Sequence, residues 1–165
     1  MLAQHVEPRE SGAHTGWTVP EALNASGAAG SLVNHSEHPL MESDVRLVVE
    51  SLLRHRLVAV VCARDVANAA RLASLFPPYL AVEPPELIGG DRAVSTAAPE
   101  IVSGTVDAVR RVAPNTVVLC GAGVHDRHDV RRALELGSGG VLVASAVAKS
   151  PSPGQAIVEL LQGFD

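Results

Sequence analysis

The stretch that decides the fold is YLAVEPPELIGG, residues 79–90. Its first four residues, Tyr79–Val82, predict a short buried strand because they are apolar or aromatic. Glu83 follows at once, and the carboxyl end of a buried strand is where α/β barrels and doubly wound sheets place chemistry. Two prolines stiffen the exit and two glycines permit a hinge, so residues 84–90 predict a lid. The alternative is a solvent-exposed glutamate followed by an ordinary turn.

Length and composition predict a single α/β domain, residues 1–165. Of the 165 residues 47% are apolar but only 2% are aromatic. The core must therefore be built from Val, Leu, Ile and Ala. Such a core suits helices packed closely on a parallel sheet better than an aromatic-rich sandwich.

Charge and cysteine content narrow the function classes. The net charge is −5 and there is no basic block, so neither nucleic acid nor an anionic membrane is an expected partner. The sequence shows no apolar run of membrane-spanning length and no signal-peptide pattern, which favours a cytoplasmic location. Cys62 and Cys120 each lie inside an apolar run. They are expected to be buried reduced thiols rather than a disulfide or metal pair.

Apolar runs alternate with amphipathic segments along the whole chain. Strands are predicted at residues 2–6, 31–33, 57–62, 79–82, 116–120 and 141–143. Helices are predicted at residues 20–25, 65–75, 126–136 and 153–161, and a further helix is predicted to start at Pro99. Another helix is predicted to begin at a cap formed by Ser43 or Asp44. Its apolar face would consist of Val45, Val48, Val49, Leu52 and Leu53. This alternation predicts right-handed crossovers and a parallel sheet.

Several chemistry-bearing residues follow these strands directly. In a parallel sheet all carboxyl ends face one rim, so His35, Glu83, residues 121–123 and Ala144-Ser145 are expected to converge there. Glu83 behind a lid is a candidate general base. His35 is a candidate neutral imidazole that donates to a carbonyl, although a lone histidine is more often structural. The small residues after the last two strands predict a phosphate cradle of backbone N–H groups. Without an HxH, HExxH or CxxC pairing, no metal site is predicted.

At this point the residues resemble a known family. The segments NHSEH (34–38), AVEPPELIGG (81–90), LCGAG (119–123) and VLVASAV (141–147), in this order and spacing, resemble triosephosphate isomerase of the archaeal type. AQHVEP (3–8) and GAHTG (12–16) resemble that branch's third strand and the loop after it. The resemblance implies a partial (β/α)8 TIM barrel, with about six parallel strand–helix units corresponding to the family's third to eighth. It therefore also implies an N-terminally truncated chain.

The resemblance also implies a reaction, the interconversion of dihydroxyacetone phosphate and D-glyceraldehyde 3-phosphate in glycolysis and gluconeogenesis. Glu83 would be the base and His35 the electrophile, supported by Asn34 and Glu37. The phosphate contacts would be Ile88, Gly89, Gly123, Ala144 and Ser145. Residues 84–95 would form the lid, and Thr15 would lie in a loop that reaches a second subunit. No cofactor and no metal are implied.

The sequence departs from the family at several points. The family's first two strands are absent, and with them an Asn-x-Lys motif whose lysine holds the substrate. Lys149, the single lysine, does not match that motif. Gly90-Asp91 and Ala146 also differ from the usual pattern. We therefore expect this chain alone to be inactive and either to self-associate as a homo-oligomer or to aggregate through its open strand edges. Two alternatives are a catalytically inactive partial-barrel remnant that binds phosphate or a partner chain, and an unrelated doubly wound phosphate-binding module.

Overall fold

The computed structural model describes residues 1–88 and 93–165, and within them the chain forms one six-stranded parallel sheet. The strands lie side by side in chain order, β1 to β6. They are β1 Leu2–Ala3, β2 Gly30–Val33, β3 Val58–Ala63, β4 Tyr79–Val82, β5 Val117–Cys120 and β6 Gly140–Val141. Each strand is parallel to the next, as the alternation of strands and helices predicts.

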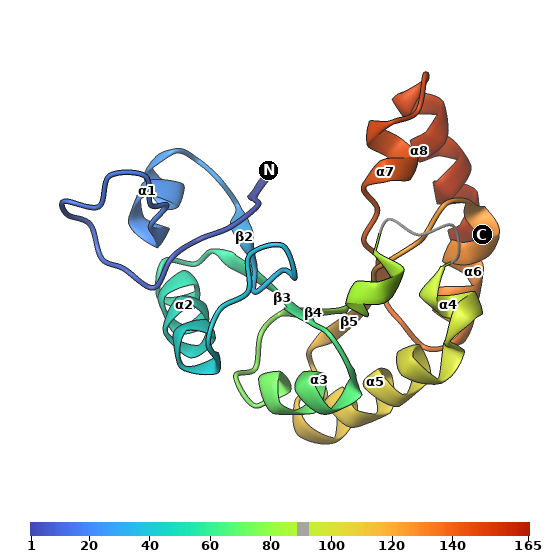
Figure 1. Ribbon diagram of the computed structural model, residues 1–165, viewed down its shortest axis with the longest axis horizontal. Helices are drawn as coiled ribbons and strands as arrows, with labels where there is room; N and C mark the ends of the chain where they lie inside the picture. The colour runs from blue at the N-terminus through green and yellow to red at the C-terminus, as the bar shows by residue number, and fades with distance from the viewer. Residues whose placement is uncertain (89–92) are drawn as a thin grey trace.

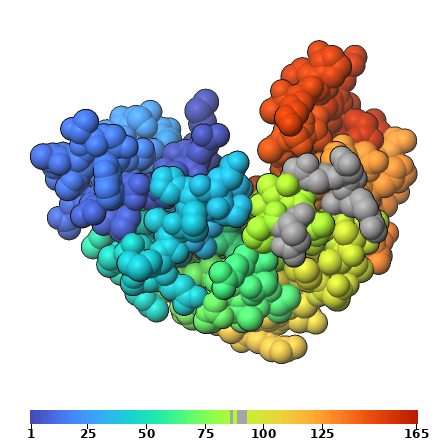
Figure 2. All heavy atoms as spheres, in the orientation of Figure 1, coloured from blue at the N-terminus to red at the C-terminus, as the bar shows by residue number. Residues whose placement is uncertain are grey.

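Helices connect successive strands and cover the convex side of the sheet (Figure 1). They are α1 Pro20–Ala25, α2 Glu42–Arg54, α3 Val66–Ala73, α4 Val94–Ala97, α5 Pro99–Val112, α6 Arg127–Glu135, α7 Ser145–Ala148 and α8 Pro153–Leu161, with 3-10 turns η1 Pro85–Leu87 and η2 Gln162–Phe164. The result is a curved partial (β/α)8 barrel. Its concave side is an open hollow between the β1–α1 arm and the α7–α8 arm (Figure 2).

The core lies between the central strands and the helices α2, α3 and α5. The predicted face of α2 is fully buried at Val45, Val48, Val49 and Leu52. Leu53 is 41% exposed, so its assignment to that face is wrong. The α2 cap is also wrong, since the helix begins after Met41 rather than after Ser43 or Asp44. Asp65 and Asp126 cap α3 and α6 by accepting from backbone N–H groups, as their type favours.

The two edge strands are shorter than the sequence predicts. Residues 2–6 and 141–143 were predicted as strands, but β1 and β6 have two residues each. Among the described residues, β1 pairs only with β2 and β6 only with β5. Half of their backbone groups therefore lack a ladder partner. Two four-residue helices, α4 and α7, were not predicted because they are too short to show a helical period.

Both cysteines are buried and free, as predicted. Within the described residues no helix combines the length and the apolar character that a membrane crossing requires.

Candidate active site

Glu83 lies at the centre of the rim, one residue beyond β4. Its N–H donates to Ala63 O of β3 at 2.8 Å, and the Gly121 N–H donates to Val82 O at 3.0 Å, so the ladder on both sides of β4 extends to this point. The residue is only 8% exposed. Its Oε2 accepts no hydrogen bond from the part of the chain that the structure describes. A buried carboxylate oxygen without a partner is unfavourable unless a ligand or proton meets it, so this atom is poised for chemistry.

The surroundings of Glu83 raise the pKa of its carboxyl group above its usual value. Burial is the main cause, because it disfavours the charged form, and the exposed Glu37 carboxylate adds to it. His35 and the neighbouring Cys62 thiol act in the opposite direction and lower this pKa. The net effect is a stronger base than an exposed glutamate. The Cys62 thiol is itself buried, which raises its pKa, and the nearby Glu83 charge adds to the effect.

His35 follows β2 and faces Glu83. Its Nε2 lies 3.6 Å from Glu83 Oε2. The Glu37 backbone N–H donates to His35 Nδ1 at 3.3 Å, which makes Nδ1 the acceptor. In a neutral imidazole the other nitrogen then carries the proton. Nε2 can therefore donate a hydrogen bond toward the rim.

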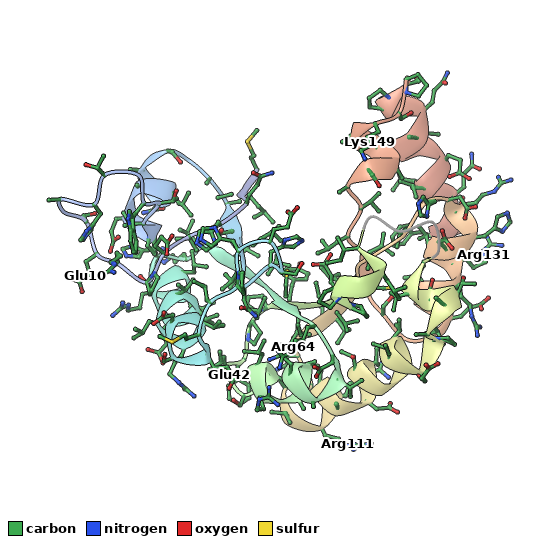
Figure 3. All side chains as sticks on the ribbon, viewed as in Figure 1. Glu10, Glu42, Arg64, Arg111, Arg131 and Lys149 are labelled. Carbon is green, nitrogen blue, oxygen red and sulfur yellow. The ribbon has the colours of Figure 1, made fainter. Side chains whose placement is uncertain are left out.

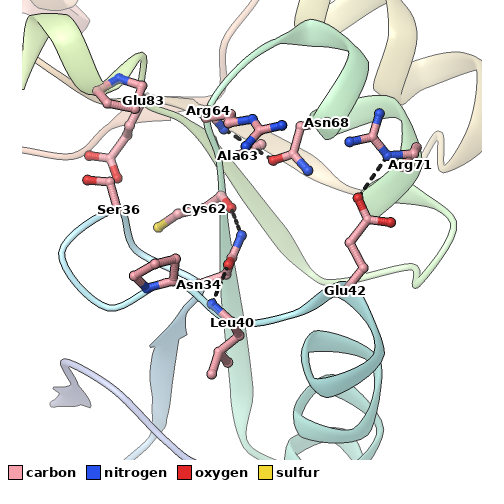
Figure 4. Close-up of a pocket in the computed structure, with 12 residues that line it drawn as sticks. Asn34, Ser36, Leu40, Glu42, Cys62, Ala63, Arg64, Asn68, Arg71 and Glu83 are labelled. Carbon is pink, nitrogen blue, oxygen red and sulfur yellow. Dashed lines mark hydrogen bonds and ion pairs between the residues drawn. The ribbon is translucent and has the colours of Figure 1, made fainter.

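Asn34 fixes the turn that presents His35. Its backbone has φ +63°, a left-handed conformation that asparagine tolerates better than most residues. Its side-chain Nδ2 donates to Cys62 O at 2.9 Å, and its Oδ1 accepts from the Leu40 N–H at 2.9 Å (Figure 4). The asparagine thus ties the loop after β2 to the end of β3 and sets the direction of the next residue.

Glu83 separates two pockets. The larger has a volume of about 550 Å³, within the range of small-molecule sites. It is lined by seven of the predicted site residues, His35, Glu37, Glu83, Ile88, Gly123, Ala144 and Ser145. Asn34 lines the smaller pocket instead, which has a volume of about 290 Å³ (Figure 4). Gly89 lies outside the described residues.

The smaller pocket contains two arginines, but each already has an acidic partner. Arg71 Nε lies 2.8 Å from Glu42 Oε1, and Arg64 Nε lies 3.2 Å from Asp65 Oδ2. Their charges are largely compensated. The geometry therefore favours the larger pocket as the substrate site.

Gly121 is a site residue that the sequence did not single out as a neighbour of Glu83. A Cβ at this position would overlap the Glu83 carboxylate. The next residue, Ala122, has φ +65°, and its carbonyl accepts the Val94 N–H at 3.2 Å. The turn after β5 thus leaves room for the carboxylate and holds the start of α4. The remainder of the expected lid, residues 89–92, lies outside the described residues.

One group of possible metal ligands occurs in the described ranges, namely His5, Glu7 and His38. His5 and His38 also line the larger pocket.

The comparisons with known proteins agree with this geometry. The family model for triosephosphate isomerase matches residues 1–162. A triosephosphate isomerase of Cenarchaeum symbiosum is 48% identical over 164 residues, which are 99% of this chain and 73% of the relative. That of Methanothermus fervidus is 45% identical over 161 residues, or 98% of this chain and 72% of the relative. The triosephosphate isomerase of Methanopyrus kandleri is 44% identical over 165 residues, which are 100% of this chain and 73% of the relative. With this agreement along nearly all of its length, the chain belongs to the triosephosphate isomerase family of isomerases.

Proposed function

We propose that this chain carries the catalytic pair of an enzyme that interconverts dihydroxyacetone phosphate and D-glyceraldehyde 3-phosphate. The observation that carries the proposal is the approach of His35 Nε2 to Glu83 Oε2, 3.6 Å apart on the wall of one pocket. This pairing of a carboxylate base with a neutral imidazole is the established chemistry of triosephosphate isomerases and the standard illustration of tuned acid–base groups.

The two side chains divide the chemistry. Glu83 removes a proton from the carbon beside the substrate carbonyl and returns it to the neighbouring carbon. His35 donates its Nε2–H to the carbonyl oxygen, which gains negative charge as the proton leaves. Burial of Glu83 supports its role, because a raised pKa strengthens the base.

Backbone groups after the last two strands are proposed to hold the phosphate. Gly123, Ala144 and Ser145 line the pocket that contains the catalytic pair, and Ile88 lines it from the side of the lid. Gly89 is proposed as a further phosphate contact by its place in the family motif. Asn34 and Glu37 are proposed to orient His35, through the turn and through the bond to Nδ1.

The described residues that line this pocket include no lysine and no arginine, so none of them supplies a positive charge for the developing enediolate. Lys149 is the single lysine, and it is exposed at the tip of the α7–α8 arm (Figure 3). Loss of one stabilising donor of this kind costs about 3 to 4 kcal/mol of transition-state stabilisation. We therefore propose that residues 1–165 form one incomplete barrel domain, whose activity requires a strand–helix–strand unit with Asn-x-Lys. We further propose a cytoplasmic location, from the two buried free thiols, and a homo-oligomer.

The test is isomerisation of glyceraldehyde 3-phosphate by two purified proteins. One is the 165-residue chain, and the other is its fusion to a strand–helix–strand unit from an archaeal relative, called the completed protein below. We expect turnover only from the completed protein. Glu83→Gln should lower its kcat by about 10²- to 10⁴-fold.

Glu10→Gln is the matched control, because Glu10 is an exposed carboxylate outside the pocket (Figure 3). It should leave kcat unchanged. A completed protein that folds but turns over at the same rate with Gln at position 83 would overturn the assignment of the base. Full turnover by the 165-residue chain would show that the lysine is dispensable.

A further inference from the structure

Two histidines and a glutamate meet at the end of β1, outside the proposed catalytic pair. His5 Nε2 lies 3.1 Å from Glu7 Oε1, and His38 Nε2 lies 3.9 Å from the same oxygen. One potential ligand atom from each of the three residues falls within 4.8 Å of the others. Around a tetrahedral ion with bonds near 2.0–2.2 Å, neighbouring ligand atoms are roughly 3.3 Å apart. The cluster is therefore close to the size that such an ion requires.

The backbone holds this cluster in place. Val6 is fully buried between His5 and Glu7, whose side chains approach each other to 3.1 Å. The Glu7 N–H donates to Thr18 O at 2.7 Å, which anchors the loop after β1. The His38 N–H donates to His35 O at 2.9 Å, which anchors the loop after β2. Because β1 and β2 are paired neighbours, these two loops start side by side.

One buried nitrogen of the cluster lacks a hydrogen-bond partner. His5 Nε2 is shielded from solvent, yet it has no hydrogen-bond partner among the described residues. The His5 and Glu7 side chains are 17% and 15% exposed. A buried ring nitrogen that lacks a hydrogen-bond partner and lies beside a carboxylate can be stabilised by a cation between the two groups.

The ligand types select the kind of ion. Two imidazoles and one carboxylate form the donor set of open zinc sites, whereas magnesium and calcium prefer oxygen donors alone. The rings of His5 and His38 are stacked, with centroids 3.6 Å apart and planes at 5°. Each Nε2 lone pair lies in the plane of its ring, so with the two planes stacked one ring must turn before both nitrogens can point at one ion. The His38 side chain is 60% exposed and has room to turn.

We propose that His5, Glu7 and His38 form a binding site for a divalent transition-metal ion of the zinc type. The three side chains supply three ligands, and water from the pocket completes the coordination. Since His5 and His38 line the pocket that holds His35 and Glu83, the ion would lie beside that site and join the ends of β1 and β2. The proposal does not depend on the proposed isomerase chemistry. Spacing rules miss this site because His38 is far from His5 and Glu7 in sequence.

Cobalt(II) is the probe for the test, because four-coordinate Co²⁺ absorbs visible light far more strongly than hydrated Co²⁺. The 165-residue chain and the completed protein, both without a polyhistidine tag, are titrated with CoCl2. We expect an intense visible band that saturates at one equivalent and disappears on addition of Zn²⁺. His38→Gln and Glu7→Gln should each weaken Co²⁺ binding by at least about tenfold.

His128→Gln is the matched control, because His128 is an exposed histidine on α6, away from the cluster. It should bind Co²⁺ like the wild type. His38 is largely exposed, so its replacement leaves the fold intact, and circular dichroism verifies this for each variant. Absence of the band from the wild type overturns the proposal. Equal binding by the wild type, His38→Gln and Glu7→Gln also overturns it and shows that these side chains are not the ligands.

Discussion

The central strands and the edge strands of this sheet differ in length. Strands β2 to β5 have a neighbour on both sides and run for four to six residues. Strands β1 and β6 have one neighbour among the described residues and run for two. The strands with a neighbour on both sides are thus the longer ones, as expected where the backbone groups on both sides of a strand can pair.

The candidate site is divided in the same way. Glu83 and His35 follow central strands and are held by ladder bonds and by the Asn34 side chain. The proposed phosphate contacts Ala144 and Ser145 follow the edge strand β6. Ala144 is exposed, and α7, which starts at Ser145, contains no buried residue. The positions of Glu83 and His35 are thus fixed by contacts within the described fold, whereas Ala144 and Ser145 lie in a more exposed part of it.

The largest effect is expected on self-association, when the added strand–helix–strand unit of the completed protein covers the edges of the sheet. The outer sides of β1 and β6 offer unpaired backbone groups, and α8 exposes Ile157, Val158 and Leu161 by 46–59%. We expect the 165-residue chain to form species larger than those of the completed protein, growing with concentration. Sedimentation velocity over a dilution series measures this. A chain that stays monomeric throughout would show that these edges are self-protected.

The next largest effect is expected on stability, when a leucine is shortened to alanine in a central strand and in an edge strand. Leu80 in β4 is fully buried, so Leu80→Ala should lower the free energy of unfolding by about 2–5 kcal/mol. Leu2 in β1 is 42% exposed, and Leu2→Ala should cost no more than about 0.5 kcal/mol. Urea unfolding of the dilute 165-residue chain gives both values. Similar costs at the two positions would refute the contrast between centre and edge.

A smaller effect is expected on kcat when Gly121, which contacts Glu83 at the end of β5, is replaced. Gly121→Ala places a Cβ on the Glu83 carboxylate and must displace it. A displacement of about 1 Å can cost about 100-fold in kcat, which we expect for the completed protein. Gly154→Ala in α8 is the matched control, because its Cβ meets no atom within 4 Å. If both variants keep full kcat, Glu83 does not need its observed position.

The smallest effect is a pH dependence of stability. Burial raises the pKa of Glu83 above the usual value of 4.5. The folded protein therefore holds this proton more tightly than the unfolded chain, and the stability from it is lost as pH rises through the raised pKa. Relative to Glu83→Gln, the wild type should lose unfolding free energy as the pH rises above about 4.5, by at most about 1.4 kcal/mol per pH unit. A difference that is flat or grows with pH, in urea unfolding of the completed protein, would contradict this.

The sequence predicts well those elements that a breaker residue bounds. The strand Tyr79–Val82 and the helix Pro153–Leu161 have the predicted bounds. In both cases a breaker residue stands next to a clear apolar pattern. At the edges the same reasoning extends the strands too far, because composition does not reveal whether a pairing partner is present.

The convergence of the site was predictable for a similar reason. His35, Glu83, Gly123 and Ser145 follow parallel strands, and the topology then brings them to one pocket. The roles of these residues remain predictions. Contacts that depend on side-chain packing were not predictable, among them the position of Gly121 against Glu83 and the cluster formed by His5, Glu7 and His38.

The strictly sequential strand order has a further consequence. Each strand pairs with the strand next to it in the chain, through the five pairings β1–β2 to β5–β6. Such an array resembles a solenoid, in which stability is approximately a sum over units and their nearest-neighbour interfaces. Units can then be added or lost at either end with little effect on interfaces elsewhere. Ring closure introduces the one interface that joins distant parts of the chain, and with it cooperativity between the first unit and the last.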